Sequence, residues 1–221
     1  MLQAGLFDVG EPSFDPELSR GCRQDLGDGA WLEHRPSWLN GHQRVFEQLL
    51  STARWQRHSR QMYDRAVEVP RLTAALPERG EAAELMRRIA NLLSSRYQRP
   101  LKSIALAHYR DGRDSVAPHG DKMGSLAHDT VIAILSVGSP RRFTLRSVQH
   151  RSTRRFQLGW GDLLVLGGSC QKTFLHGVPK VARAGPRISI QFREALPDAE
   201  GERLAGGLLF TRTVSRSFVS S

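Results

Sequence analysis

Residues 130–168 read TVIAILSVGSPRRFTLRSVQHRSTRRFQLGWGDLLVLGG and decide the expected fold. Short apolar runs over 130–137, 141–148, 154–159 and 162–168 are separated by Gly, Pro, Ser or Asp. Close spacing of strand-like runs, with little helix between them, is typical of a β-sandwich or a jelly roll. The stretch therefore predicts four strands of a β-rich core.

Three further runs extend this β-rich half in both directions. SIALAHY (103–109) precedes the stretch, and TFLHGV (173–178) and RISIQFR (187–193) follow it. RISIQFR alternates polar and apolar residues, so its polar side chains share one face of a half-buried strand. Together the seven strand candidates predict a double-stranded β-helix, or jelly roll.

The N-terminal half has helical patterns instead. Residues 40–53 carry apolar side chains at helical spacing after a candidate Asn40 cap. Residues 79–97 form the clearest apolar stripe, which Pro100 is expected to end. Residues 61–73 alternate and contain a proline, which predicts a strand running into a loop. We expect an α+β chain whose N-terminal helices pack on the jelly roll.

The 221 residues suit one domain. We expect a flexible N-terminal arm over 1–30, a single domain over 31–195 and a C-terminal tail over 196–221. Within the domain, 31–100 holds the helices and the strand-like segment near 61–73, and 101–195 the jelly roll. The sequence has two cysteines and neither a long apolar run nor a signal-peptide pattern. These features favour a cytoplasmic protein with no membrane partner, and we expect a monomer.

The chain is strongly basic, with 32 Lys and Arg against 22 Asp and Glu and a net charge of +10. Only four of the 32 are lysine, so 28 are arginine, which makes forked contacts with phosphate. Six arginines and no acidic residue lie within 141–155. A nucleic-acid partner accounts for this composition, and so do arginines spread over a solvated surface.

A metal site is suggested by APHGDKMG, in which His119 and Asp121 lie one residue apart. Two histidines and one carboxylate bind iron in Fe(II) oxygenases and leave open positions on the metal. The second histidine should lie on a later strand that returns beside the first. His128 is too near and His150 lies in an arginine-rich connection, whereas His176 lies in a strand-like run. His176 is therefore the candidate, and an ordinary hydrogen-bonded strand-end histidine is the alternative.

Arg187 and Arg193 stand at the two ends of the polar face of RISIQFR. A half-buried strand with these charges needs anions, because an unpaired buried charge is very costly. A dicarboxylate cosubstrate beside the metal would supply them. Two solvated arginines on a surface strand are the alternative.

These elements together resemble the AlkB family of dioxygenases. The resemblance rests on His119-x-Asp121, on His176 about 57 residues later, and on R-x-S-x-x-x-R over 187–193. Three further segments are similar to family segments: YRDGRDSVAPHGDK (109–122) to the strand and loop that lead to the metal, and GDLLVLGGSCQKTFLHGVPKV (161–181) to the second metal strand. MYDRAVEVPRLTA (62–74), within 31–100, is similar to the segment ahead of the family's nucleotide-recognition loop. The family repairs N-alkylated bases in DNA and RNA with Fe(II), 2-oxoglutarate and O2, and the match covers roughly residues 30–195.

The resemblance implies roles for single residues. His119, Asp121 and His176 would bind the iron, and the cosubstrate would be contacted by Tyr109, Arg187, Ser189 and Arg193. Nucleic-acid contacts are expected from Tyr63, Arg71, Lys122, Met123, Arg146, Arg154 and Arg155.

The chain departs from the family pattern at three places. Ala107 and Ser189 stand where asparagines are usual, and Ala75-Leu76-Pro77 replaces the aromatic residues that clasp a flipped base. Trp55 and Tyr63 are candidates for that stacking role, and core packing is the alternative.

The expected function is oxidative demethylation of 1-methyladenine and 3-methylcytosine in DNA, with release of formaldehyde and succinate, in alkylation repair. Single-stranded DNA is the expected partner. One alternative is an oxygenase of the same fold that acts on RNA or a small molecule, which the missing aromatic residues favour. A non-catalytic nucleic-acid-binding module is the other, and the intact set of candidate ligands argues against it.

Overall fold

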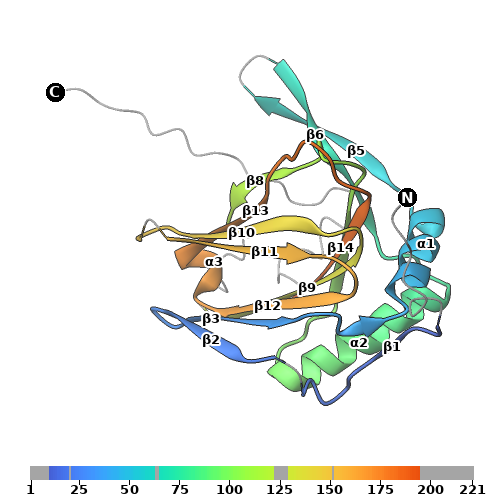
Figure 1. The fold of residues 1–221 in the computed structure, drawn as a ribbon, viewed down its shortest axis with the longest axis horizontal. Coiled ribbons are helices and arrows are strands. Elements are labelled where there is room, and N and C mark those ends of the chain that lie inside the picture. Colours follow the sequence, from blue (N-terminus) through green and yellow to red (C-terminus); the bar gives the residue numbers. More distant parts are fainter. Residues whose placement is uncertain (1–9, 20, 63–64, 122–128, 151, 195–221) are drawn as a thin grey trace, which may run out of the picture.

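The computed structural model of the chain describes residues 10–19, 21–62, 65–121, 129–150 and 152–194, and two facing sheets dominate this part (Figure 1). In spatial order the larger sheet contains β2 (Arg23–Gly27), β3 (Ala30–Arg35), β12 (Asp162–Gly168), β9 (Thr130–Gly138), β14 (Arg187–Arg193), β7 (Ser103–Tyr109), β6 (Arg65–Ala75) and β5 (Gln56–Met62). The smaller sheet contains β11 (Thr153–Leu158), β10 (Arg141–Ser147), β13 (Phe174–Val178) and β8 (Val116–His119). A separate pair joins β1 (Ser13–Phe14) to β4 (Leu39–Asn40). The strand pairs are antiparallel, and the arrangement is that of a jelly roll.

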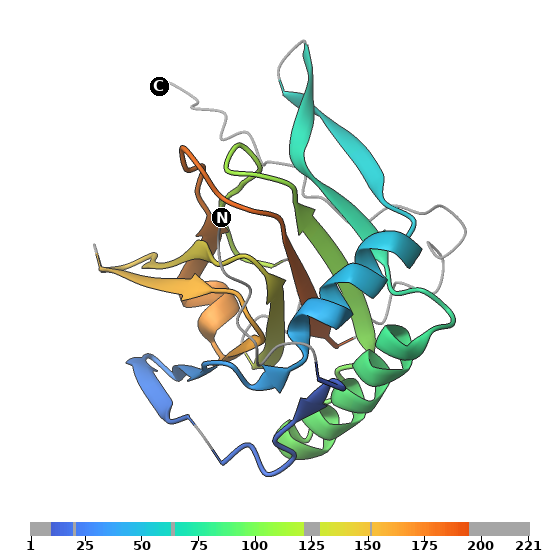
Figure 2. The same cartoon turned by 45° about the vertical axis from the view of Figure 1, so that its right-hand side comes forward.

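The helices lie mainly beside the larger sheet. The helices α1 (His42–Thr52) and α2 (Glu81–Tyr97) flank the side of this sheet that faces away from the smaller one (Figure 2). The one-turn α3 (Cys170–Thr173) precedes β13. No helix in the described part of the chain has the length and apolar character needed to span a bilayer.

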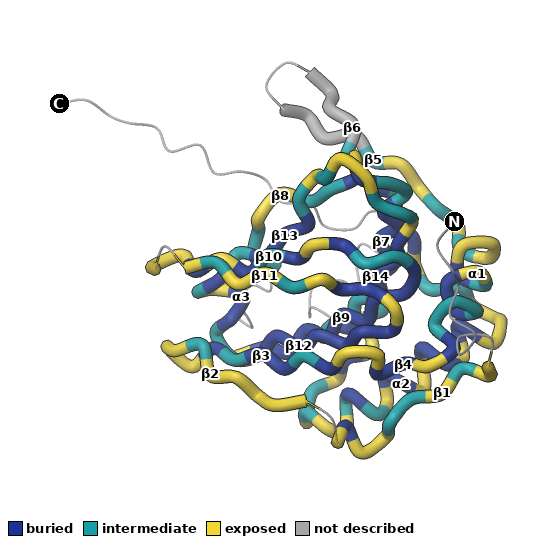
Figure 3. The backbone as a smooth tube through the Cα atoms, viewed as in Figure 1, coloured by how far each residue is buried: buried dark blue, intermediate teal, exposed yellow. Residues whose placement is uncertain are grey.

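Two apolar clusters explain why residues 131–135 of β9 are all hydrophobic. Val131 and Leu135 belong to the cluster shared with α1 and α2, whereas Ile132 and Ile134 belong to the cluster between the two sheets. A strand that is covered on both faces needs apolar residues at every position. The buried central strands in Figure 3 are therefore those with the longest apolar runs.

All seven predicted strands of the C-terminal half are confirmed, with ends that shift by at most one residue. Both predicted helices are confirmed as well. The cap of the first helix is wrong, because Gly41, with φ 64°, precedes α1 while Asn40 ends β4. The second helix ends at Tyr97 and is capped by Gln98 in the left-handed conformation, two residues before Pro100.

The segment 61–73, predicted as a strand running into a loop, does contain a strand, but this strand, β6, continues through the expected loop and forms a hairpin with β5. Pro70 does not end the strand, which continues to Ala75. The β5–β6 register shifts between Arg57 and Ser59, so the pairing skips the region around Pro70. A proline is tolerated at such an irregularity because it has no N–H to give to the ladder.

The expected arm over 1–30 is not free of sheet structure. Residues 1–9 and 20 lie outside the described residues, but β2 and the first residue of β3 belong to the larger sheet. The sequence of β2, RQDLG, is mostly polar because the strand lies at the sheet edge and is largely exposed. The C-terminal tail, 196–221, lies outside the described residues.

Candidate metal centre

His119, Asp121 and His176 come together between the two sheets. His176 on β13 lies opposite His119 on β8, and directly opposed residues share one face. His176 also lies opposite Leu145, which belongs to the cluster between the sheets, so both imidazoles face the interior. Asp121 Oδ1 lies 3.6 Å from His119 Nε2 and 3.9 Å from His176 Nε2. Ligand atoms of the three residues all lie within 4.8 Å of one another.

The donor atoms suit a metal ion. The Nδ1–H of His119 donates to the carbonyl of Ala117 at 2.9 Å, which leaves the Nε2 lone pair free. Asp121 Oδ2 is buried without a hydrogen bond from the described residues, although the Arg193 Nη2 forms an ion pair with it at 3.0 Å. Two imidazoles and one carboxylate form the facial set that Fe(II) oxygenases use.

The protonation states also suit a metal ligand set. Burial lowers the pKa of His176 to about 4 and lowers the pKa of His119, so both rings are neutral at pH 7. Burial alone would raise the pKa of Asp121, but the positive charge of Arg193, 3.0 Å away, brings it below its usual value. The site therefore presents two neutral imidazoles and one carboxylate, the forms that coordinate a cation.

Two neighbouring residues hold the ligands in place, and no pattern in the sequence predicted either of them. Gln171 on α3 accepts a hydrogen bond from the backbone N–H of Asp121 at 3.0 Å. The ring of Phe143 stacks on the ring of His176, with centroids 5.8 Å apart and planes inclined by 15°. Both contacts arise from tertiary packing and join residues far apart in the chain.

Arg187 and Tyr109 lie opposite each other on β14 and β7. Arg187 is 1% exposed, and its guanidinium carbon lies 5.4 Å from the centroid of the Tyr109 ring. Its Nη2 donates to the Ser136 hydroxyl at 2.6 Å, while Nε and Nη1 have no hydrogen-bond partner among the described residues. Burial lowers the pKa of Arg187 to about 10, which still leaves it charged at pH 7. A buried cation with two free N–H groups is suited to bind an anion.

The remaining predicted cosubstrate residues lie on the same strand as Arg187. Ser189 is buried and lies opposite Ala107 on β7. Arg193 is half-buried at the far end of β14, where it contacts Asp121 and donates to Gln191 Oε1 at 2.7 Å. The structure thus brings Arg193 directly to the carboxylate of the ligand set.

The predicted nucleic-acid residues are placed unevenly. Arg71 is buried, not exposed, and its Nη1 donates to the carbonyl of Ser115 at 3.4 Å. Its charge is close enough to lower the pKa values of His119 and Asp121. Three more predicted contacts lie outside the described residues: Tyr63, Lys122 and Met123.

The three predicted arginines of β10 and β11 do not share one face. Arg154 lies opposite Leu145 and donates to Gln24 Oε1 at 2.9 Å, on the side of the smaller sheet that faces the larger one. Arg146 and Arg155 alternate with the inward-facing positions and lie exposed on the outer side. Of the three predicted arginines, only Arg146 and Arg155 therefore lie on the outer face, where both could contact one ligand.

The stacking partner for a flipped base is not evident among the described residues. Trp55 is half-buried against the helix-side cluster, and its ring lies 5.2 Å from that of His108. Its Nε1–H donates to the Leu50 carbonyl at 3.0 Å, which is how a core tryptophan is held. Ala75 is exposed at the end of β6 and offers no aromatic face.

Comparison with known proteins gives a family match over most of the chain. The model of the 2OG-Fe(II) oxygenase superfamily matches residues 16–193. The human alpha-ketoglutarate-dependent dioxygenase alkB homolog 3 is 26% identical over 179 residues, which cover 71% of this chain and 63% of the human protein. The Arabidopsis thaliana DNA oxidative demethylase ALKBH2 is 32% identical over 118 residues, 42% of this chain and 38% of that protein. The chain therefore matches less than two thirds of either relative's length.

A solved structure entitled "The structure of OsALKBH1" has a similar fold. Its TM-score is 0.56 at 14% identity, and the superposition covers 79% of this chain and all of that one. At this identity the likeness concerns the fold alone. The family match over 16–193 begins well inside the expected N-terminal arm and includes β2, as the structure does.

Proposed function

Because the chain belongs to the 2OG-Fe(II) oxygenase superfamily, as an AlkB-type member, we propose that it is an Fe(II)- and 2-oxoglutarate-dependent dioxygenase that demethylates N-alkylated bases in DNA. The expected substrates are 1-methyladenine and 3-methylcytosine. The observation that carries the proposal is the convergence of His119, Asp121 and His176 in one barrel that also contains the buried Arg187.

The ligand set would hold Fe(II) through His119 Nε2, His176 Nε2 and the Asp121 carboxylate. Iron with 2-oxoglutarate and O2 supplies the oxidant for an N-methyl group, with succinate and CO2 as products of the cosubstrate. Arg193 keeps Asp121 ionised and limits the orientations of its carboxylate. Hydroxylation of the methyl group gives a hemiaminal, which releases formaldehyde and the unmodified base.

Arg187 would bind a carboxylate of 2-oxoglutarate through Nε and Nη1, the two groups without a partner among the described residues. Tyr109 would add its hydroxyl, and its ring supports the guanidinium from one side. Ser189 lies two residues further along the same face and can donate one hydrogen bond. Ala107, opposite Ser189, cannot contribute a polar contact, so Arg187 carries more of the cosubstrate binding.

The DNA contact is supported by the net charge and by exposed arginines around the barrel. Arg146 and Arg155 are suited to phosphate because neither has an acidic partner among the described residues. Single-stranded DNA is the proposed form, since its bases reach a buried centre without disruption of a duplex. The exposed Ala75, in place of an aromatic residue, favours RNA or a small molecule as the second candidate.

The test uses purified protein with Fe(II), ascorbate, 2-oxoglutarate and a single-stranded DNA that carries one 3-methylcytosine. Mass spectrometry follows the oligonucleotide, and succinate is measured in parallel. Demethylation that requires both iron and 2-oxoglutarate supports the proposal. Matched RNA and duplex DNA decide the nucleic acid, and omission of 2-oxoglutarate is the control. Succinate formation with every nucleic acid unchanged would point to another substrate, and no succinate from iron-loaded protein would contradict the enzyme itself.

A further inference from the structure

The segment RDGRD, residues 110–114, folds into a tightly bonded loop before β8. Arg110 donates to the Asp114 carboxylate from its backbone N–H, from Nε and from Nη2, each at 2.8 Å. Arg113 donates to the Asp111 carboxylate from Nε at 3.0 Å and from Nη2 at 2.7 Å. Burial works against ionisation of Asp114, but these bonds keep its pKa below the ordinary value. The loop therefore has a defined shape.

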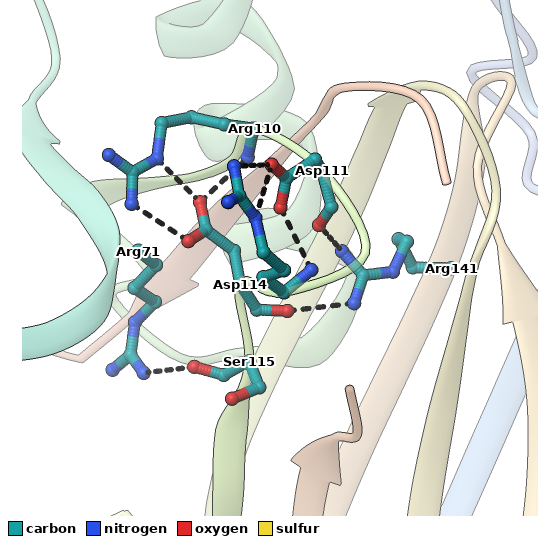
Figure 4. Close-up of polar contacts among 7 residues, drawn as sticks. Arg71, Arg110, Asp111, Asp114, Ser115 and Arg141 are labelled. Atoms are coloured by element: carbon teal, nitrogen blue, oxygen red, sulfur yellow. Dashed lines mark hydrogen bonds and ion pairs between the residues drawn. The ribbon is translucent and has the colours of Figure 1, made fainter. Parts of the chain in front are cut away.

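Arg141 fastens this loop to the rest of the barrel (Figure 4). Arg141 is 1% exposed, whereas the next residue on β10, Arg142, is exposed. Arg141 Nη1 donates to the carbonyl of Asp111 at 2.7 Å, and Nη2 donates to that of Asp114 at 2.8 Å. Nη2 also reaches the carbonyl of Pro179 at 3.1 Å. One planar cation thus joins two segments that are far apart in the sequence.

Backbone contacts join the same two segments independently of Arg141. The N–H of Val181 donates to the Gly112 carbonyl at 2.9 Å. A Cβ on Gly112 would overlap the carbonyl oxygen of Val181, so this approach needs a glycine. The 110–114 loop and the 179–181 turn therefore lie in direct contact.

These two segments are the ones that lead to the metal ligands. The 110–114 loop runs through Ser115 into β8, which ends at His119, and Pro179 directly follows β13, which carries His176. The two strands pair at His119–His176 and at Val116–Val178, with an irregularity between these pairs. A four-residue strand with a broken register fixes the strand separation weakly, so a second attachment near its start has a large effect.

We propose that Arg141 is a positioning residue for the metal centre: by tying the 110–114 loop to Pro179, it sets the separation of the strands that carry His119 and His176. The inference rests on the proposed function only through the Fe(II) site and does not depend on the substrate. Arg141 itself does not contact the ligand atoms. Its contribution is to the geometry in which the two imidazoles meet a metal.

The test measures metal binding by the full chain with Co(II) as the probe, without cosubstrate or nucleic acid. The variants are Arg141→Met, which loses the fork and the charge, and Arg141→Lys, which keeps only the charge. Arg142→Met is the matched control, because it changes the adjacent exposed arginine. Supporting partners of metal ligands typically affect affinity by about 10–100-fold. We expect Co(II) binding to weaken at least about tenfold in Arg141→Met, with an altered visible spectrum, and to stay near wild type in Arg142→Met.

Thermal unfolding of the metal-free variants shows whether a loss of Co(II) affinity comes from misplaced ligands or from a general loss of stability. A folded Arg141→Met with wild-type Co(II) affinity and spectrum would overturn the proposal, whatever its melting temperature. If Arg141→Met does not fold, Gly112→Ala tests the same attachment through the Val181 contact and should weaken Co(II) binding in the same direction. Unchanged affinity in folded Gly112→Ala and Arg141→Lys would equally overturn it. A wild type that binds Co(II) but leaves methylated DNA unchanged would contradict only the proposed substrate.

Discussion

The inner and outer faces of the smaller sheet differ sharply in how their polar residues are held. On the inner face, Arg141 and His176 are buried and contact defined partners. On the outer face, Arg146 and Arg155 are exposed and have no side-chain partner among the described residues. A buried polar group requires specific partners, whereas water can satisfy an exposed one. The chemistry of the inner face is therefore constrained by its partner residues, whereas that of the outer face is constrained far less.

The largest expected effect is on the inner face, at a metal ligand. His176→Ala removes one of three ligands, so we expect Co(II) binding and iron-dependent turnover to fall to background while the protein stays folded. The matched control is His150→Ala, which changes an exposed histidine beyond the end of β10. Calorimetric Co(II) titration measures the effect. Tight Co(II) binding by folded His176→Ala would remove His176 from the ligand set.

A second change, on β14 of the larger sheet, tests cosubstrate binding separately from metal binding. Arg187→Met should raise the KM for 2-oxoglutarate at least about 30-fold, equivalent to ~2 kcal/mol, because a buried charge pair is lost. Co(II) affinity should change little, since Arg187 does not contact the three ligands. The exposed Arg183 serves as the control in Arg183→Met. An unchanged KM in Arg187→Met would place the cosubstrate carboxylate elsewhere.

The same difference between buried and exposed residues decides which parts of the fold and of the metal site could be predicted from the sequence. The strands over 103–193 were predictable because apolar runs report burial on one or both faces. The ligand set was predictable because His119-x-Asp121 needs a third ligand on a returning strand, and His176 alone had that setting. Strand β8 was missed because VAPH is four residues long and contains a proline. Strand β2 was missed because an exposed edge strand can be polar throughout.

The supporting contacts could not be predicted. Arg141 and Gln171 bond to backbone groups of distant segments, and such contacts leave no residue pattern in one sequence. Arg141 was counted with the basic cluster, although it is buried and holds the 110–114 loop. The face of Arg154 was equally hidden, because only the β10–β11 register places it opposite Leu145.

A smaller effect is expected on the helix side of the larger sheet. His108 is buried beside Trp55, and neither ring nitrogen has a hydrogen-bond partner among the described residues. Burial lowers its pKa, with Asp114 opposing and Arg110 assisting the shift. The folded state thus binds the proton less readily than the unfolded state, so stability contributed by neutral His108 is lost as pH falls below about 6.5.

His108→Leu should remove that part of the pH dependence. The free energy of unfolding is measured by urea titration from pH 7.5 to 5. Wild type should lose stability relative to the variant over this range, by ~1.4 kcal/mol for each unit of pKa shift. His150→Leu, at an exposed site, should follow wild type. Parallel curves for wild type and His108→Leu would show that His108 does not titrate differently on folding.

The smallest effect is expected on the outer face, where it would sharpen the contrast with the inner one. If Arg146 and Arg155 contact phosphates, the double change to alanine removes two contacts. The slope of log K against log salt for single-stranded DNA should then become shallower by about 1.4, or ~0.7 per contact. Arg154→Ala is the control, because Arg154 faces the other way and bonds to Gln24. Equal slopes for wild type and the double variant would show that Arg146 and Arg155 are solvated and do not contact DNA. A shallower slope in Arg154→Ala would instead place the DNA contact at the edge between β11 and β2.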